Sequence, residues 1–224
     1  GHSASGVFVD ENARTTVDGL YAAGDMASVP HNYMLGAFTN GMVAGEDAVD
    51  FVKEIDFAEY DEADVHAEKE RVLAPTLRED GIPPNQLEYK TRRLVNDYLQ
   101  PPKVTRKMQL AQDRFAETRN DMEQAMVVTN AHELMRSLEV ASIMDCADMA
   151  AHASLFRTES RWGLYHNRAD FPERDNENWF CHSLLSKNSS GAMSIEKKAV
   201  EPYIIPIDEE EKDAYQQQRV KVNS

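Results

Sequence analysis

The chain has 224 residues, of which 24 are Lys or Arg and 39 are Asp or Glu, so its formal net charge at pH 7 is −15. Such an acidic surface argues against binding to nucleic acid, whose phosphates need basic groups, and against anionic membrane surfaces. A chain of this length can bury a sizeable core and hold one or two domains.

The first 55 residues predict a strand, a turn, a second strand, a loop and a helix. The first strand covers residues 6–10, and the second ends at Asp25. The helix is expected over residues 37–53, because apolar side chains recur there with helical spacing. A strand that ends in Gly-Asp before a glycine-lined helix start can hold a phosphorylated cofactor, since the helix start offers unpaired N–H groups and the positive end of a dipole.

The middle of the chain predicts an acidic linker and then a small helical bundle. Residues 56–84 are acidic, can be helical from 65 to 77, and end in a Gly-Ile-Pro-Pro cluster that breaks a helix. Three helical patterns follow, over residues 85–100, 107–126 and 132–157. Thr129 or Asn130 can cap the third, which can be broken once. These patterns predict a bundle of about three helices over residues 85–160.

The helical period ends at Arg161. Residues 184–186 and 192–195 flank a Lys-Asn-Ser-Ser-Gly turn and predict a hairpin. Residues 198–207 are expected to be extended, since two prolines prevent a helix, and a polar tail follows from residue 208. The domains expected are therefore 1–55, 56–84, 85–160, 161–207 and the tail 208–224.

Neither a metal site nor a membrane span is expected. The two cysteines, Cys146 and Cys181, form no Cys-x-x-Cys pair, so the sequence predicts no zinc or iron–sulfur site. They fit buried thiols in a reducing compartment, and we expect a cytoplasmic protein. No apolar run approaches the roughly 20 residues of a spanning helix.

Two well-separated motifs give the chain a family resemblance. The stretch T-x-x-x-G-L-Y-A-A-G-D, which ends at Asp25, resembles the second FAD-contacting motif of flavoproteins with two dinucleotide-binding domains. Residues 158–179, TESRWGLYHNRADFPERDNENW, resemble a signature near the C-terminus of fumarate reductase/succinate dehydrogenase flavoproteins. Residues 30–41, PHNYMLGAFTNG, resemble more closely the adenylylsulfate reductase alpha-subunit branch. The resemblance covers residues 1–55 and roughly 90–206.

This resemblance implies a fold and a reaction. The fold is α/β plus α: the C-terminal piece of a two-dinucleotide-binding-domain FAD fold, then a helical domain and an irregular extension. The reaction is hydride or two-electron transfer at the N5 atom of FAD. The family's flavin domain opens with a Gly-rich phosphate loop, but the chain has no Gly-x-Gly-x-x-Gly, so we expect a longer polypeptide to supply that portion.

The implied partners are the N-terminal portion of the same flavoprotein, an iron–sulfur (ferredoxin-like) subunit and a small anionic substrate. The clusters must sit on another subunit, because this chain lacks ligands for them. A different interpretation is a noncatalytic assembly module that keeps a remnant of the flavin motif.

The expected cofactor contacts lie on both sides of the loop after Asp25. The Asp25 carboxylate would accept hydrogen bonds from the ribityl hydroxyls, although an ordinary turn aspartate is the alternative. Backbone N–H groups near the helix start would donate to the flavin, and those expected are Leu35, Gly36, Ala37, Phe38 and Thr39.

Two histidines are the first catalytic candidates that the resemblance implies. His2 matches a histidine that contacts substrate in the dicarboxylate branch, and its alternative is a terminal residue or a cloning remnant. His31 lies in the loop that would pass over the flavin, and its alternative is a cap for the following helix. Met34 stands where the dicarboxylate branch has a substrate-clamping Arg, which argues against fumarate or succinate as the substrate.

Arg161 and Arg168 are the second pair of catalytic candidates. A guanidinium can bind an anionic substrate through charge-assisted hydrogen bonds. The neighbouring carboxylates of Glu159 and Asp170 allow a structural alternative, in which these pairs staple an irregular segment together.

Overall fold

The computed structural model describes residues 5–29, 33–56, 59–161, 163, 165–188 and 190–200. Two compact units make up the chain, Gly1–Lys69 and Glu70–Ser224. The division falls within helix α2 (Glu62–Leu73), which buries none of its residues. The predicted linker is thus partly helical, and a short 3-10 helix, η2 (Ala74–Leu77), follows α2. The predicted domain boundaries at residues 55, 84 and 160 stay predictions.

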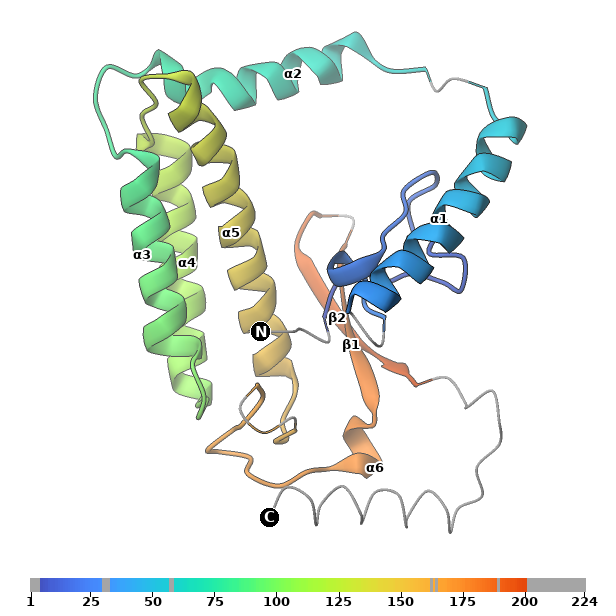
Figure 1. Cartoon of the computed structure of the whole chain (residues 1–224). Helices are drawn as coiled ribbons and strands as arrows, with labels where there is room; N and C mark the ends of the chain where they lie inside the picture. The colour runs from blue at the N-terminus through green and yellow to red at the C-terminus, as the bar shows by residue number, and fades with distance from the viewer. Residues whose placement is uncertain are drawn as a thin grey trace. The chain divides into compact units, whose positions relative to one another are not determined.

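The first unit consists of a loop region, the 3-10 turn η1 (Gly24–Met26) and helix α1 (Met34–Glu54), which lies beside η1 (Figure 1). Among the described residues, the two predicted strands form only isolated β-bridges. Val7 pairs with Ala27, and Arg14 pairs with Tyr21. A strand needs a ladder of neighbouring pairs, so neither stretch forms one here. The α/β character predicted for this unit is therefore reduced to isolated bridges.

Helix α1 begins earlier than the pattern predicts. Tyr33 is extended, with φ −97° and ψ 175°, and its carbonyl accepts the Ala37 N–H over 2.8 Å, which closes the first helical turn. Because Gly36 has a low helix propensity, the sequence pattern predicts a later start for this helix.

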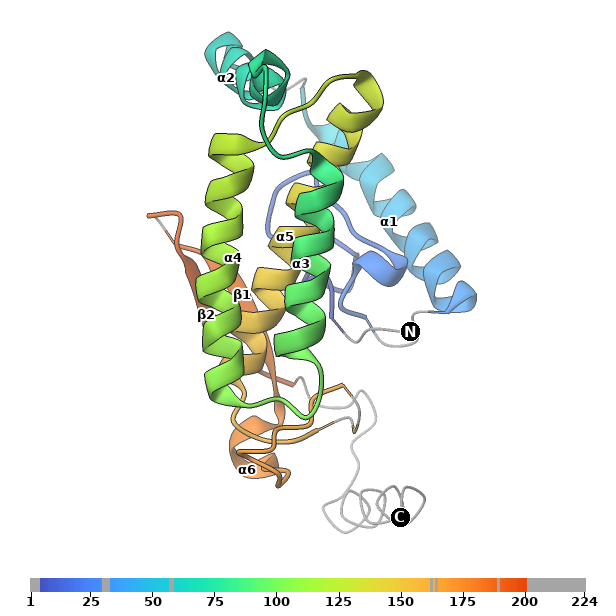
Figure 2. The same cartoon turned by 90° about the vertical axis from the view of Figure 1, so that its left-hand side faces the viewer.

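The second unit is built on a three-helix bundle of α3 (Pro84–Leu99), α4 (Thr105–Ala125) and α5 (Ala131–Phe156). Each helix contacts the other two, and they lie side by side (Figure 2). The three predicted helices are confirmed, and α5 is unbroken. Asn130 caps α5, since its side-chain oxygen accepts the Glu133 N–H over 3.0 Å, while the Glu133 carboxylate accepts the Thr129 N–H over 2.8 Å.

The bundle core is apolar, with two buried threonines. The Thr91 hydroxyl donates to the Leu87 carbonyl over 2.9 Å, and the Thr118 hydroxyl to that of Arg114 over 2.7 Å, so both polar groups are satisfied. The buried apolar residues that form one cluster are Leu87, Leu99, Met108, Ala111, Phe115, Met122, Met126, Val140, Met144, Ala147 and Ala151.

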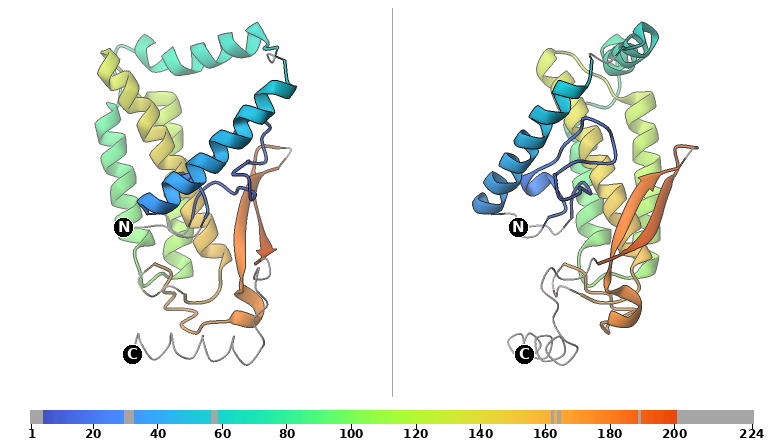
Figure 3. Two further views of the ribbon diagram at one scale, coloured as in Figure 1. Left: turned by 45° about the vertical axis from the view of Figure 1, so that its right-hand side comes forward. Right: turned by 90° about the vertical axis from the view of Figure 1, so that its right-hand side faces the viewer.

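A hairpin follows the bundle. Strands β1 (Cys181–Lys187) and β2 (Met193–Ala199) pair antiparallel from Cys181–Ala199 to Lys187–Met193, and the short helix α6 (Asn176–Trp179) precedes them (Figure 3). The predicted hairpin is confirmed and is longer than expected, because its outer pairs, such as His182 with Lys198, are polar. Most of the predicted extended stretch 198–207, and the tail, lie outside the described residues.

Candidate functional site

The segment that carries the first motif is laid along α1 in the opposite direction. As the segment advances from residue 19 to residue 24, its partners on the helix move back from residue 51 to residue 37. The three contacts are Gly19 with Phe51, Tyr21 with Asp47, and Gly24 with Ala37. This path brings the end of the motif to the first turns of α1.

Gly24 is required at this approach. Its φ is +67°, and a Cβ atom added there would lie 3.3 Å from the Cβ of Ala37. Only glycine adopts such a backbone without strain, and only a residue without a side chain leaves this spacing unchanged. Gly24 thus allows η1, which contains Asp25, to pack on the start of α1.

Asp47 ties this arrangement together from the middle of α1. Its carboxylate accepts two hydrogen bonds from Arg14, Nε to Oδ2 over 2.5 Å and Nη2 to Oδ1 over 2.9 Å, and one from the Tyr21 hydroxyl over 2.7 Å. The Arg14 hydrogen bonds, and then that of Tyr21, lower the pKa of Asp47. The pKa of Tyr21 is raised, first by desolvation and then by Asp47. Asp47 therefore stays a carboxylate near neutral pH.

Asp25 presents a free acceptor beside the helix start. Its side chain is exposed and makes no hydrogen bond or ion pair with the residues that the structure describes. The α1 N-terminus likewise lacks a side-chain cap. Of the five predicted backbone donors, Ala37 is bonded to Tyr33, and helix geometry commits Phe38 and Thr39 to carbonyls one turn earlier. Leu35 and Gly36 lie in the first turn of α1, so their N–H groups have no acceptor within the helix.

These groups fit a phosphorylated flavin cofactor such as FAD. A free carboxylate suits sugar or ribityl hydroxyls, and an uncapped helix start suits a negatively charged or electron-rich edge. Gly24 supplies the close backbone approach between the two. The histidine candidates His2 and His31 lie outside the described residues, and Met34 is 75% exposed at the first position of α1.

Arg168 lies in the second unit and is fully buried. Its five N–H donors make five hydrogen bonds, which is all a guanidinium can donate. The acceptors are both carboxylate oxygens of Asp170, the Ser154 and Arg157 carbonyls, and the Thr105 hydroxyl. The bonds leave no donor for an anionic substrate, so they favour the structural alternative for this residue.

Arg161 joins a second buried ion cluster around Glu159. The Glu159 carboxylate is fully buried and accepts from Arg161 Nε over 2.6 Å, from Arg157 Nη1 over 2.5 Å and from the Asp175 N–H over 2.8 Å. Burial raises the pKa of Glu159, but the hydrogen bonds from Arg161, the Asp175 N–H and Arg157 outweigh it, and the pKa is lowered overall. Arg161 also donates to Asn176 Oδ1 over 2.9 Å. These bonds hold α6 against the segment after α5.

Trp179 anchors the same region. Two cations lie near its ring, with Lys197 Nζ 3.7 Å and Arg157 Cζ 5.3 Å from the ring centroid. Phe156 packs edge-on against it at 5.3 Å. The second motif therefore links the end of α5 to the hairpin.

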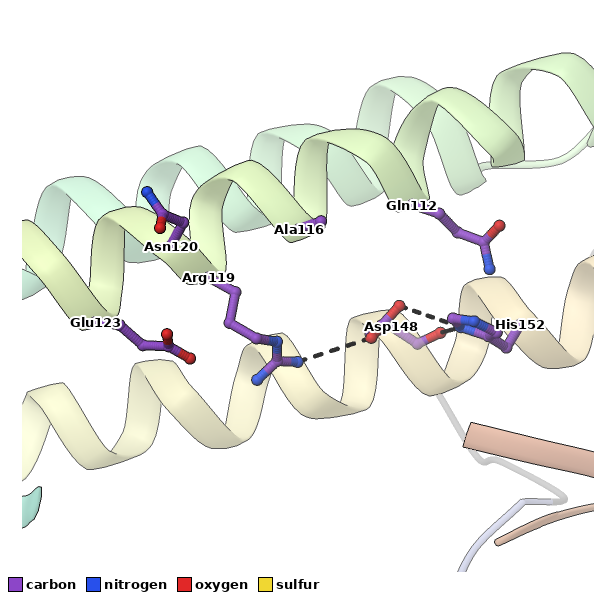
Figure 4. Close-up of a pocket in the computed structure, with 7 residues that line it drawn as sticks. All are labelled: Gln112, Ala116, Arg119, Asn120, Glu123, Asp148 and His152. Atoms are coloured by element: carbon purple, nitrogen blue, oxygen red, sulfur yellow. Dashed lines mark hydrogen bonds and ion pairs between the residues drawn. The ribbon is translucent and has the colours of Figure 1, made fainter. Parts of the chain in front are cut away.

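A cleft of about 310 Å³, lined mainly by polar residue types, lies between α4 and α5 (Figure 4). Arg119 and His152 both point to Asp148, and His152 Nδ1 lies 3.0 Å from the Asp148 carbonyl and 3.1 Å from its carboxylate. Both neighbours are acceptors, so Nδ1 carries the proton. The other lining residues are Gln112, Ala116, Asn120 and Glu123. Sequence reasoning missed this cleft, because it arises only where two helices pack.

Two features are absent from the described residues. No group of three or more His, Cys, Asp or Glu side chains among them could hold a metal ion. Among the helices in this part of the chain, none is long and apolar enough to cross a membrane.

Comparison with known proteins supports the family resemblance of the two motifs. The family model described as "Fumarate reductase flavoprotein C-term" matches residues 89–214. A fumarate reductase flavoprotein subunit from Haemophilus influenzae is 26% identical over 213 residues, which is 89% of this chain and 35% of that protein.

Solved structures of similar fold also include flavoproteins of these types. Adenylylsulfate reductase from Archaeoglobus fulgidus is 28% identical with a TM-score of 0.79, over 88% of this chain and 33% of that chain. A quinol fumarate reductase from E. coli, at 20% identity and TM-score 0.82, shares the fold over 93% of this chain and 38% of its own. The chain spans about a third of the length of these relatives. Since the family model matches more than half of its residues, the chain belongs to the fumarate reductase/succinate dehydrogenase flavoprotein family.

Proposed function

We propose that this chain is part of a FAD-dependent oxidoreductase, as the C-terminal portion of a flavoprotein subunit of the fumarate reductase, succinate dehydrogenase or adenylylsulfate reductase type. The observation that carries the proposal is the exposed Asp25 carboxylate, which has no partner among the described residues, beside the start of α1, which has no side-chain cap there. Family membership supports the enzyme class and the cofactor, FAD. The alternative of a noncatalytic assembly module has no comparable support.

Bound FAD supplies hydride or two-electron transfer at its N5 atom. In this chain, Asp25 would accept hydrogen bonds from the ribityl hydroxyls and so help to position the cofactor. The first-turn N–H groups of Leu35 and Gly36 would donate to the electron-rich edge of the flavin and would favour its negatively charged form. His2 and His31 would provide polar contacts for a small anionic substrate.

The surface of α1 supports a further protein partner. Five apolar side chains recur along one stripe of the helix, and each is at least half exposed: Leu35, Phe38, Met42, Val49 and Val52. Such a contiguous apolar stripe marks a protein contact. The N-terminal portion of the same flavoprotein would cover it, since the relatives are about three times as long as this chain.

An iron–sulfur (ferredoxin-like) subunit is the proposed electron partner. The described residues include no metal-ligating cluster, so single electrons have to leave the flavin for centres held elsewhere. Cys146 is exposed and Cys181 is half-buried, so the expectation that both thiols are buried is wrong. Both are free, which suits the cytoplasm, where thiols stay reduced.

The Asp25→Ala substitution in the full-length flavoprotein tests the proposal. We expect the variant to lose FAD more readily, with a Kd about tenfold to a hundredfold higher, because a hydrogen bond to a charged acceptor is removed. Flavin absorbance before and after dialysis measures this. Asp18→Ala, another aspartate in the same motif and also exposed, is the matched control. A colourless wild-type protein, or equal retention in Asp25→Ala and wild type, would contradict the proposed site.

A further inference from the structure

We propose that Asp47 is a positioning residue for the flavin, acting through Tyr21 and Arg14. The inference rests on the proposed function, because it concerns how the same site is held in place. Asp47 does not belong to either motif. It lies in the middle of α1, away from the helix start that is proposed to contact the cofactor.

The Asp47 carboxylate binds both sides of one turn. Arg14 and Tyr21 are paired across an antiparallel bridge, which is held by Thr15 N–H to the Leu20 carbonyl over 2.9 Å and Ala22 N–H to the Ala13 carbonyl over 3.1 Å. Directly opposite residues of such a pair direct their side chains to the same face. Both side chains hydrogen-bond to Asp47, so one carboxylate holds the turn between Arg14 and Tyr21 against α1.

The hydrogen bonds of Asp47 with Arg14 and Tyr21, called the clamp below, are better buried and better oriented than those of an ordinary surface ion pair. The Asp47 side chain is 16% exposed, and both of its oxygens are used. The contact with Arg14 is bidentate, which fixes direction as well as distance. By comparison, Asp50 on the same helix pairs with Lys53 over 2.8 Å but is 77% exposed, and such pairs contribute little.

The clamp sets the spacing that the proposed site needs. Tyr21 comes one short extended stretch before Gly24 and Asp25, and Gly24 contacts α1 at Ala37. Tyr21 is bonded to the same helix at Asp47. The segment that carries Asp25 is therefore attached to α1 at two points. The contact of Tyr21 with Asp47 fixes where along the helix Gly24 can meet Ala37. Loss of the Asp47 contact would let Asp25 shift relative to the N–H groups of Leu35 and Gly36.

Substitutions at Asp47 in the full-length flavoprotein test this. Asp47→Ala removes every acceptor, Asp47→Asn keeps an acceptor but loses the charge, and Tyr21→Phe removes one hydroxyl. Asp50→Ala and Asp50→Asn change the same charge on the same helix and are matched controls. Three quantities are measured: the Kd for FAD, the flavin reduction potential, and hydrogen exchange of the amides from Leu20 to Asp25.

We expect Asp47→Ala to raise the Kd for FAD about tenfold and to shift the potential, with smaller changes for Asp47→Asn and Tyr21→Phe. Exchange from Leu20 to Asp25 should quicken in all three variants and stay at the wild-type rate in both controls. The swap of Arg14→Asp with Asp47→Arg should restore part of the affinity. A purely stabilising role would alter exchange and leave the potential unchanged.

Two results would overturn the proposal. One is wild-type affinity and potential in Asp47→Asn and Tyr21→Phe, variants that preserve the packing and cover the case in which Asp47→Ala does not fold. The other is unchanged hydrogen exchange in these variants. The exchange readout needs no flavin, so it still decides whether the clamp exists if the wild-type protein proves to lack FAD. That last finding would refute the proposed function and, with it, the role in flavin positioning.

Discussion

Arg168 and Asp170 form a two-bond ion pair, in which Nε donates to Oδ1 over 2.8 Å and Nη2 to Oδ2 over 2.9 Å. The pair also joins distant parts of the second unit. Asp170 accepts from the Thr105 N–H at the start of α4 over 2.8 Å, and Arg168 donates to the Ser154 carbonyl in α5 over 2.8 Å. The pKa of Asp170 is held well below its usual range, chiefly by the Arg168 hydrogen bonds.

Replacement of Arg168 should therefore destabilise the second unit strongly. Arg168→Met removes both Arg168 hydrogen bonds to the Asp170 carboxylate, which keeps its Thr105 donors, and one hydrogen bond to each of the Ser154 and Arg157 carbonyls. We expect a loss of about 3–5 kcal/mol in the free energy of unfolding. Chemical denaturation measures it. Arg174→Met is the matched control, since Arg174 is exposed and has no partner among the described residues, and it should stay within about 0.5 kcal/mol. Equal effects of the two substitutions would argue against a structural role for Arg168.

Gly24→Ala should destabilise the first unit. The new side chain would occupy a left-handed backbone conformation and lie 3.3 Å from the Cβ of Ala37, so we expect a cost of about 1–2 kcal/mol. For Gly41→Ala we expect the opposite effect on stability. A Cβ added at Gly41, inside α1, would meet no atom within 4 Å beyond its chain neighbours and the adjoining helix backbone, and the substitution should stabilise by about 0.5–1 kcal/mol. Thermal unfolding compares them, and a neutral Gly24→Ala would show that the approach to Ala37 is loose.

Stability of the second unit should fall as the pH drops below neutrality, partly through His166. Desolvation, followed by the positive charge of Lys103, lowers the pKa of His166 from 6.5 to about 4, even though the Arg157 carbonyl 3.2 Å from its Nε2 favours the charged ring. The unfolded chain therefore binds more protons between these values, so the contribution of His166 is complete above pH 6.5 and is lost toward pH 4. His166→Gln should flatten the pH dependence in that window. The contribution of Asp170 is lost only at lower pH, below its ordinary value of 3.8. Denaturation of both proteins at a series of pH values checks this, and parallel curves from pH 6.5 to 4 would contradict it.

Under the proposed function, the full-length flavoprotein should turn over fumarate and succinate poorly. Met34 stands at the position where the resemblance places a substrate-clamping Arg, and a thioether cannot pair with a carboxylate. Steady-state assays with a viologen donor for fumarate and a dye acceptor for succinate measure the rates. Rapid turnover of either dicarboxylate would mean that another cation binds it.

The helices and the hairpin could be predicted because their signals are local. Apolar residues from Leu87 to Met144 recur with helical spacing, and they are the residues that fill the bundle core. Asn130 is a strong cap from its residue type alone. The hairpin was underestimated because its outer pairs are polar and show no apolar alternation.

The arrangement of the site depends on contacts that residue types do not encode. Asp47 appears in the sequence as one more acid on a solvated helix, and only its distances to Arg14 and Tyr21 single it out. The open N–H groups were predicted too broadly, since the start of α1 at Met34 commits Phe38 and Thr39 to the helix itself. The expected strands need neighbours to form ladders, and single bridges are all that residues 5–29 provide.

The opposed path of the first motif along α1 also limits how this chain can change in length. Tyr21 and Gly24 each contact a fixed place on one rigid helix. One residue inserted or deleted between them would turn every following side chain to the opposite side and misplace one of the two contacts. Homologous chains that keep this clamp should therefore tolerate substitutions between Tyr21 and Gly24 but no insertion or deletion there.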